Sequence, residues 1–515
     1  MSRVKVPLAF DLEYNYTSNQ TIEDLEPQAY MKNCIVSKQG AQDFIVEKRP
    51  GYYLYHDFSG VGVEGYGCYY WQNDSTTNLI SVTWDGSDWH AYKAAGTSIG
   101  TMHGTYHGEA NSQCEFAEFY DSALDEILVI KAYSVAAQDN DIWYVNHTMT
   151  TVTEITTAMG APDSTAGDYT VPGVVSMDGY IFVACANGRI FNCNLGDITT
   201  WTATDFVSAE RYDDTTKFIC KHKNNIAVFG DQSIEFFYNA SHPGGSPLQR
   251  RDDVFYDMGL ASYLYFPQSQ PIDSNDSLIA FVGNKGGVTA DEQEHNGVYI
   301  IENFQLRKIS TPAIDKLVDG DASVRIIDGR DRAYITVTMK ETIYDTYYYN
   351  YVYDTSSGLW YYWDIEGAGA GIKGAHSNWF ITYEGKVYYD NQHNNVYRYN
   401  DGNASAGYTV ITSTIVTPDW DGGTPAEKYI NETMLVGQFS DASAADNIAV
   451  SWSDDSGQNF NTARNIDQRY FRPLHRCGRT RRRRWKLVHS SDNNIILNYM
   501  ELRGDITDSS TARDT

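Results

Sequence analysis

From about residue 61 to residue 402 the chain repeats one pattern of apolar and polar positions. Short stretches of alternating apolar residues are separated by Gly, Asn or Asp turns, as in VVSMDGYIFVACANGRIFNCN, with turns at Asp178-Gly179 and Asn187-Gly188. Alternation with a period of two is typical of half-buried strands, and Asp-Gly and Asn-Gly favour tight hairpins. Each unit spans roughly 30 to 45 residues and could supply one propeller blade. The pattern predicts an all-β protein with a β-propeller of six or seven blades; a β-sandwich with long excursions is the structural alternative.

The same pattern suggests where domains begin and end. Residues 1–60 are mixed and are expected to form a short N-terminal arm with the first strands, and 61–402 the propeller. Small and polar residues over 403–426 predict a linker. Strand-like stretches follow over 427–506, so a second, C-terminal β domain is expected there. Residues 507–515 are expected to fray.

Composition supports a globular β protein and excludes some functions. Forty tyrosines suit strands whose rings are half-buried. No stretch approaches the ~20 apolar residues of a membrane span, and the N-terminal residues do not resemble a signal peptide. The cysteines are scattered and odd in number, which predicts no disulfide framework and fits synthesis and assembly in a reducing cytoplasm. A formal charge of −28 argues against general DNA binding, because phosphates would be repelled.

One segment breaks the acidic character. Between Arg464 and Lys486 there are ten Arg or Lys residues and one acid, so the rest of the chain carries −37. In an extended strand, alternate arginines point to opposite faces, and unpaired guanidinium groups cannot enter a core. A solvated loop is one interpretation. We expect instead a clamp for acidic protein surface, since Arg binds carboxylates bidentately. The candidate interface residues are Arg476, Arg479, Arg481, Arg482, Arg483, Arg484 and Lys486.

The other motifs predict structure and no catalytic residue, metal or cofactor. Ser453, Asp455, Gly457 and Phe460 match an Asp-box turn, in which Asp caps a hairpin and Gly supplies the positive-φ corner. A GxGxxG match at residues 369–374 is followed by a strand-like segment, not by the helix that a dinucleotide site needs. His103 and His107 have a metal-ligand spacing, but interrupting glycines disfavour the helix that would bring them together. No enzyme is expected from these motifs.

Four segments stand out by their order and spacing. They are the strand that ends in Arg49-Pro50-Gly51, the run from Gly230 through Ile234 and Glu235 to Gly259, a strand–turn–Trp unit at YDTSSGLWYYWD, and the closing Asp-box and arginine module. Together they resemble the tail hub or nozzle proteins of short-tailed bacteriophages, also called packaged-DNA stabilisation proteins or tail accessory factors. The likeness covers roughly residues 28–505.

The resemblance implies a structural virion protein that assembles as a ring, usually a homohexamer, below the portal and the adaptor (head–tail connector) protein. Such a ring extends the DNA channel, retains the packaged genome, conducts it during ejection without sequence-specific binding, and closes with a needle, plug or internal gate. It also anchors tail fibres or tailspikes. The alternative from another class is a tail-associated propeller that binds or hydrolyses glycans.

Overall fold

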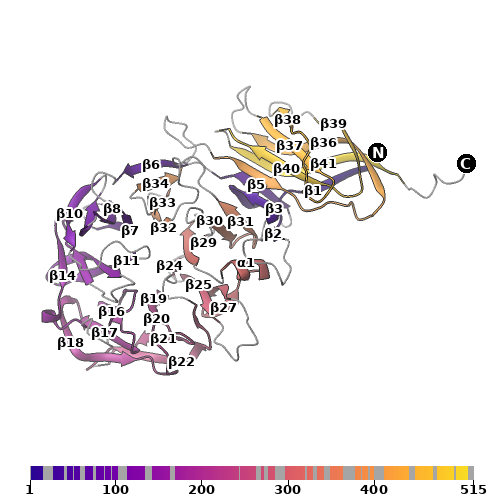
Figure 1. The fold of residues 1–515 in the computed structure, drawn as a ribbon. Helices are drawn as coiled ribbons and strands as arrows, with labels where there is room; N and C mark the ends of the chain where they lie inside the picture. The colour runs from indigo at the N-terminus through magenta and orange to yellow at the C-terminus, as the bar shows by residue number, and fades with distance from the viewer. Residues whose placement is uncertain are drawn as a thin grey trace, which may run out of the picture. The chain divides into compact units, whose positions relative to one another are not determined.

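The computed structural model describes most of the chain (Figure 1). The described residues are 2–14, 27–39, 43–49, 52–57, 64–73, 77–85, 87–93, 96–102, 113–133, 142–162, 169–242, 244–261, 268–271, 277–284, 296–318, 322–328, 333–340, 348–363, 377–383, 386–391, 395–399, 411–439, 447–467, 473–491 and 494–507. The chain forms two compact units: one comprises residues 54–340 and 376–398, and the other 1–53, 341–375 and 399–515. Each unit is described by itself, the first as the propeller and the second as the sandwich unit.

The propeller is a set of antiparallel sheets, each built from consecutive strands. The first two sheets contain β7 (Glu64–Gln72), β8 (Thr77–Trp84), β9 (Trp89–Lys93) and β10 (Thr97–Met102), then β11 (Gln113–Asp121), β12 (Asp125–Tyr133), β13 (Ile142–Val145) and β14 (Val152–Ile155). The next two contain β15 (Val175–Met177), β16 (Tyr180–Ala184), β17 (Arg189–Asn194) and β18 (Asp197–Ser208), then β19 (Phe218–His222), β20 (Asn225–Phe229), β21 (Ile234–Asn239) and β22 (Leu248–Tyr256).

The ring continues with three further sheets. The fifth contains β23 (Gly259–Leu260), β24 (Gln268–Pro271), β25 (Ser277–Asn284), β26 (Gly297–Glu302) and β27 (Gln305–Lys308), and α1 (Pro312–Leu317) follows it. The sixth contributes β28 (Ala322–Asp328) and β29 (Ala333–Lys340) to this unit. The seventh contains β32 (Ser377–Tyr383), β33 (Lys386–Asn391), β34 (Asn395–Tyr399) and the early strand β6 (Tyr52–Asp57).

Contacts between the inner strands close the ring. In the described part of the chain they run in the order β7, β11, β15, β19, β25, β28 and β32, and β32 contacts β7 again. Figure 1 shows these sheets arranged around a common centre. Because β6 comes from the start of the chain and joins the last sheet, the two ends of the propeller are tied by backbone hydrogen bonds. The β-propeller fold is thus confirmed, and the described residues supply seven blades, within the expected six or seven.

The hydrophobic cores lie between consecutive sheets. Strand β12 shows why, because Leu128 and Ile130 belong to the core shared with the first blade, whereas Ile127 and Val129 belong to the core shared with the third. Successive side chains of a strand point to opposite faces, and here both faces are covered. The sequence of β12 therefore contains a continuous apolar run, ILVI, and these residues, 127–130, are fully buried.

The sandwich unit consists of two sheets. One contains β1 (Ser2–Pro7), β4 (Cys34–Gln39), β5 (Asp43–Lys48), β36 (Glu427–Phe439), β39 (Leu474–Thr480) and β41 (Ile495–Thr507). The other contains β2 (Glu13–Tyr14), β3 (Pro27–Lys32), β30 (Tyr348–Asp354), β31 (Trp360–Trp363), β35 (Ser413–Val416), β37 (Asn447–Ser453), β38 (Arg464–Asp467) and β40 (Arg484–His489). The indole Nε1 of Trp363, on the second sheet, donates to the carbonyl of Cys34 on the first at 2.9 Å.

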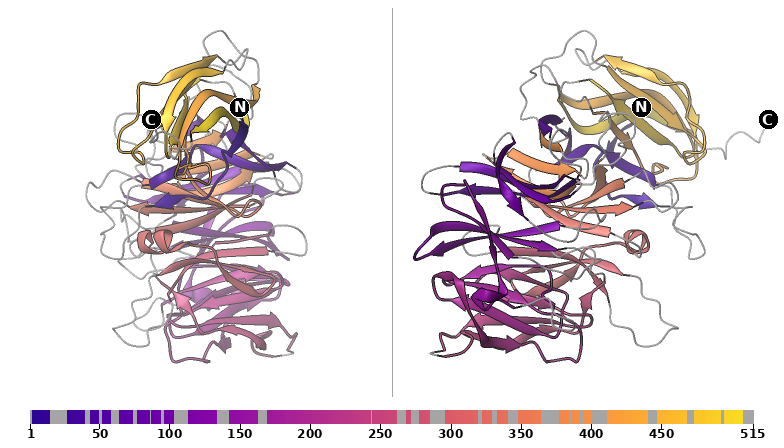
Figure 2. Two further views of the ribbon diagram at one scale, coloured as in Figure 1. Left: turned by 90° about the vertical axis from the view of Figure 1, so that its right-hand side faces the viewer. Right: turned by 60° about the vertical axis from the view of Figure 1, so that its left-hand side comes forward.

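This unit differs from the expected domain limits. Strand β1 pairs along its whole length with β41, so the N-terminal residues are part of a sheet with the C-terminal ones (Figures 1 and 2). The expected linker 403–426 contains β35, which is buried and pairs with both β3 and β40. A C-terminal domain of residues 427–506 would therefore lack strands that complete its sheets. The period-two pattern identifies strands, but it does not specify distant partners.

Helical structure is confined, in the ranges described, to α1 and one 3-10 turn at Thr157–Met159. No helix there is long and apolar enough to cross a membrane. All seven cysteines are buried and free, as the scattered spacing predicts.

Candidate functional site: an arginine-rich edge and the motif positions

The basic segment contains two kinds of arginine. It runs along β39, turns, and continues into β40. Arg483 and Arg484 are buried, with 1% and 4% of their surface exposed. Arg476, Arg479, Arg481 and Arg482 are exposed, and Lys486 is half-buried.

Arg483 connects two separate parts of the sandwich unit. Its Nε and Nη2 atoms donate to the two carboxylate oxygens of Asp454 at 2.7 and 2.9 Å. Its Nη1 donates to the carbonyl of Cys477 at 2.6 Å. Cys477 lies on β39 in the first sheet, and Asp454 follows β37 in the second. The guanidinium also lies 5.1 Å from the centre of the Trp452 ring, so its donors and its face are both used.

Arg484 forms a second internal link. Its Nε donates to Asp419 at 3.1 Å, and its Nη1 donates to the carbonyl of Gln28 at 2.8 Å. The guanidinium packs against Gly457: a Cβ built there would lie 3.1 Å from Nη1. The Asp-box turn thus packs directly against the buried part of the arginine run, and the two motifs form one structural module.

The expectation that these two residues form an interface is therefore wrong. Arg483 and Arg484 are buried inside their own chain, where they form ion pairs and hydrogen bonds with carboxylates and carbonyls. Only an unpaired guanidinium group is too costly to bury, and these two are paired. Trp485, next in the sequence, is completely buried beside Trp420, with ring centres 5.7 Å apart.

The remaining arginines form what we call the exposed arginine edge, defined as Arg476, Arg479, Arg481 and Arg482. Arg479 lies 3.7 Å from Glu427, with both side chains well exposed. For the other three, no acidic partner occurs among the described residues. Arg481 and Arg482 lie in the turn between β39 and β40. The buried ammonium of Lys428 stabilises this turn, because it donates to the carbonyl of Arg481 at 2.6 Å and to those of Thr424 and Ala426. Burial lowers the pKa of Lys428.

The Asp-box residues form a capped turn. Asp455 accepts from the backbone N–H of Asn459 at 2.9 Å and from its side-chain amide at 2.7 Å. The hydroxyl of Ser453 donates to Asp455 and accepts from the N–H of Gly457 at 2.9 Å. The φ of Gly457 is +91°, which suits glycine. These hydrogen bonds, from Ser453 first, lower the pKa of Asp455 to about 2. Phe460 contacts Lys486, whose Nζ is 5.7 Å from the ring centre.

The middle motif marks a close contact between blades four and five. Gly230 precedes β21, and its carbonyl accepts from the N–H of Leu260 at 2.9 Å. A Cβ on Gly259 would lie 2.0 Å from the backbone carbonyl of Asp231, so only glycine fits there. A Cβ on Gly230 would lie 2.3 Å from the Asp214 carboxylate. These glycines allow two chain segments to touch.

The other motif residues are also internal. Ile234 is fully buried, and the Glu235 carboxylate is 2.7 Å from Arg250 and accepts from the N–H of Arg211 at 3.1 Å. Burial raises the pKa of Glu235. Arg49 is buried, donates to Asn33 at 3.1 Å and faces the Trp363 ring at 5.1 Å.

Some predicted positions lie outside the described residues: Pro50, Gly51, His103, His107 and the glycines of 369–374. Within the described ones, no group of three His, Cys, Asp or Glu side chains could hold a metal ion. Sequence reasoning missed Asp454 and Asp419, the partners of the buried arginines. Asp454 is adjacent to the Asp-box carboxylate, and Asp419 lies in the expected linker, so neither had a local signal of its own.

The chain matches one known protein family. One family model, described as "Bacteriophage P22 Gp10, beta-propeller", matches residues 82–344, just over half of the chain. No curated protein matches.

Solved structures show partial similarity. The computationally designed Ika8 protein is 9% identical, with a TM-score of 0.38, over 67% of this chain and 99% of that one. AofleA from Arthrobotrys oligospora is 11% identical, with a TM-score of 0.35, over 63% and 90%. An ancestral GH74 enzyme is 11% identical, with a TM-score of 0.39, over 76% and 52%.

Proposed function

We propose, because the chain belongs to the bacteriophage P22 Gp10 β-propeller family, that it forms the ring-shaped nozzle, or hub, of a phage tail. As a member of that family it is a structural protein of the virion. The proposed ring is a homohexamer that lies below the portal and the adaptor. It extends the DNA channel, retains the packaged genome and conducts it during ejection, and it anchors tail fibres or tailspikes. It is assembled in the host cytoplasm, and a needle or plug protein is a further partner.

The exposed arginine edge carries this proposal. Arg476, Arg481 and Arg482 point to solvent with no acidic partner among the described residues, on a chain whose formal charge is −28. Guanidinium groups bind carboxylates through paired hydrogen bonds. A second copy of so acidic a chain, or the adaptor, is therefore a suitable partner. Exposed single ion pairs contribute little, but a cluster of them fixes the orientation of a partner.

The overall charge suits a passage for DNA. A ring of acidic subunits provides few cations for phosphates, so DNA would pass without binding to the wall. A channel wall lined by Arg and Lys in the assembled ring would contradict this part of the proposal.

Electron microscopy tests the function directly. The purified protein would be imaged in negative stain, alone and mixed with its portal–adaptor complex. We expect a sixfold ring that caps the adaptor and continues its channel. A protein that stays monomeric and does not bind the complex would exclude the nozzle function.

A further inference from the structure

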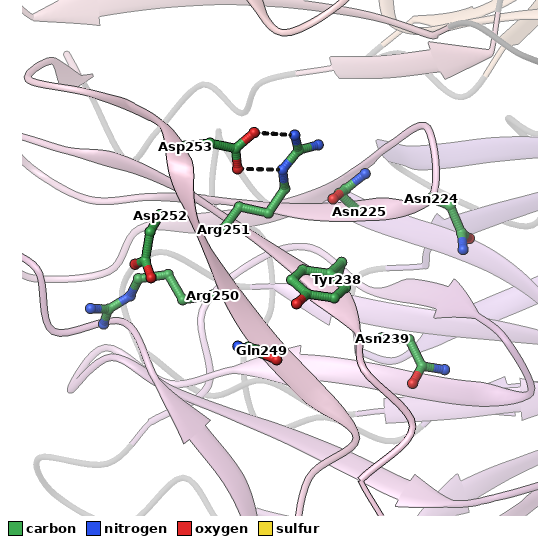
Figure 3. A pocket seen from close by; sticks show the side chains of 9 residues that line it. All are labelled: Asn224, Asn225, Tyr238, Asn239, Gln249, Arg250, Arg251, Asp252 and Asp253. Atoms are coloured by element: carbon green, nitrogen blue, oxygen red, sulfur yellow. Dashed lines mark hydrogen bonds and ion pairs between the residues drawn. The ribbon is translucent and has the colours of Figure 1, made fainter.

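A polar pocket lies at one end of the fourth blade (Figure 3). It has a volume of about 650 Å³, within the range of small-molecule sites. The first residue of β20 is Asn225, which lines the pocket. The end of β21 contributes Tyr238, and the first part of β22 contributes Gln249, Arg251 and Asp253. Tyr238, Gln249, Arg251 and Asp253 lie within the run from Gly230 to Gly259, but none of the five residues is one of the motif positions named above or part of the exposed arginine edge.

The pocket exists because β22 leaves its partner strand. Phe237 pairs with Arg250, and Glu235 pairs with Phe255. One residue of β21 is thus opposite four residues of β22, which form a wide bulge. A bulge bends its strand and redirects side chains, and such irregularities occur often beside binding sites.

Three of the four charged side chains of the pocket, those of Arg250, Arg251 and Asp253, are already paired. Arg251 donates to both carboxylate oxygens of Asp253 at 3.0 and 2.6 Å, and its guanidinium lies 4.4 Å from the Phe304 ring centre. Arg250 lies 2.7 Å from Glu235. Two arginines and two aspartates line the pocket, so its formal charges cancel. Both guanidinium groups are therefore held by carboxylates of the chain itself, which leaves neither free to bind an anion.

Two amides of the rim are held by the neighbouring blade. Asn224 and Asn239 each donate to the carboxylate of Asp178, at 3.3 and 3.1 Å. Asp178 lies in the tight turn between β15 and β16. The rim is thus fixed across two blades before any ligand arrives, which lowers the entropy lost on binding.

Four other side chains of the pocket could contact a ligand. Gln249 and Asp252 are exposed, Tyr238 is half-buried, and the amide of Asn225, though only 8% exposed, lines the pocket with no side-chain hydrogen bond among the described residues. Amides both donate and accept, a carboxylate accepts, and a tyrosine ring provides an apolar surface with a polar tip. A sugar presents hydroxyls that donate and accept around apolar C–H faces.

We propose that this pocket binds a neutral, hydroxyl-rich saccharide. Phosphate and other anions fit less well, because Asp253 and Glu235 already occupy the guanidinium groups. Hydrolysis does not follow, since glycosidases need two carboxyl groups placed across the scissile bond, whereas Asp253 is engaged by Arg251. Saccharide binding by this pocket does not require ring formation, because every lining residue belongs to the fourth blade of one chain.

Saturation-transfer NMR on the full-length protein tests it. The probes are maltohexaose, cellohexaose and mannohexaose, each measured alone and then with added inorganic phosphate or a heparin hexasaccharide. We expect saturation of at least one neutral oligosaccharide, with no displacement by the anions. Absence of transfer from all three, or displacement by either anion, would overturn the proposal.

Matched variants locate the binding. Gln249→Ala and Tyr238→Ala should each weaken the saccharide by about tenfold, as expected for losing one good contact. Gln232→Ala, an exposed amide in a different pocket of the same blade, should leave the affinity unchanged. Thermal melting of each variant checks folding. Equal affinity in all three variants would show that the sugar binds elsewhere and would refute the assignment.

Discussion

The guanidinium of Arg483 and the carboxylate of Asp454 form a bidentate ion pair, with N–O distances of 2.7 and 2.9 Å. The arginine is 1% exposed and its partner 44%. The pair joins the arginine run to the Asp-box hairpin. The arginine run therefore contains buried residues, which stabilise the fold, and exposed residues, which do not. Mutations of the two groups should have different effects.

Arg483→Ser should destabilise the sandwich unit. It removes three hydrogen bonds and leaves the Cys477 carbonyl without this donor, so we expect the free energy of unfolding to fall by about 2–4 kcal/mol. Urea denaturation followed by tryptophan fluorescence would measure it, because Trp452 lies against the guanidinium. Arg482→Ser, one residue earlier and exposed, should change the value by less than about 0.5 kcal/mol. Equal effects would contradict the division into buried and exposed arginines.

The double variant Arg481→Ser, Arg482→Ser should fold normally and fail to assemble. It removes two exposed cations from the proposed contact with an acidic partner. Light scattering and native mass spectrometry would give the size of the assembly. The matched control is Lys221→Ser, Arg307→Ser, which removes two exposed cations from the propeller. Rings that form equally well from both variants would exclude the arginine edge as the clamp.

Gly259→Ala should weaken the junction of blades four and five. Its Cβ would lie 2.0 Å from the Asp231 carbonyl, and backbone cannot move aside as a flexible side chain can. We expect a loss of about 1–3 kcal/mol, measured by thermal or urea unfolding. Gly244→Ala is the control, because its Cβ meets nothing within 4 Å. A stable Gly259→Ala protein would show that the close approach is not required.

Acid should weaken the Asp-box turn in a defined pH range. The pKa of Asp455 is about 2 when folded, below the ordinary value near 3.9. Such a carboxylate stabilises the folded state above pH 4, and this contribution is lost as pH falls from about 4 to about 2. Melting temperatures of the wild type should therefore fall more steeply across that range than those of Asp455→Asn. Parallel curves would mean that the carboxylate is not stabilised by its hydrogen bonds.

Local features of the fold could be read from the sequence. Asp178 and Gly179 both have positive φ, 51° and 81°, and Met177 pairs with Tyr180, so the Asp-Gly dipeptide forms the predicted two-residue hairpin. The alternating apolar runs form strands, and the regularly spaced turns connect consecutive strands into the sheets of the blades. These features depend on interactions between neighbours in sequence, which is why a pattern of residues is enough to predict them.

Partners distant in sequence could not be read in this way. Arg484 donates to the carbonyl of Gln28, 456 residues away, and β1 pairs with β41 at the other end of the chain. The pocket of the fourth blade depends on a bulge that brings Gln249 and Asp253 to face Tyr238 and Asn225. An arginine has the same local sequence signal whether its side chain lies in water or is buried against a carboxylate from a distant segment.

The sequence by itself determined that this protein is built of strands joined by tight turns, because strand periodicity and turn chemistry are local properties. Only the tertiary structure decided which charges are neutralised inside the chain and which remain exposed for a partner. The physical reason is that a buried guanidinium is stable only where carboxylates and carbonyls from distant segments meet it, and packing alone brings those segments together.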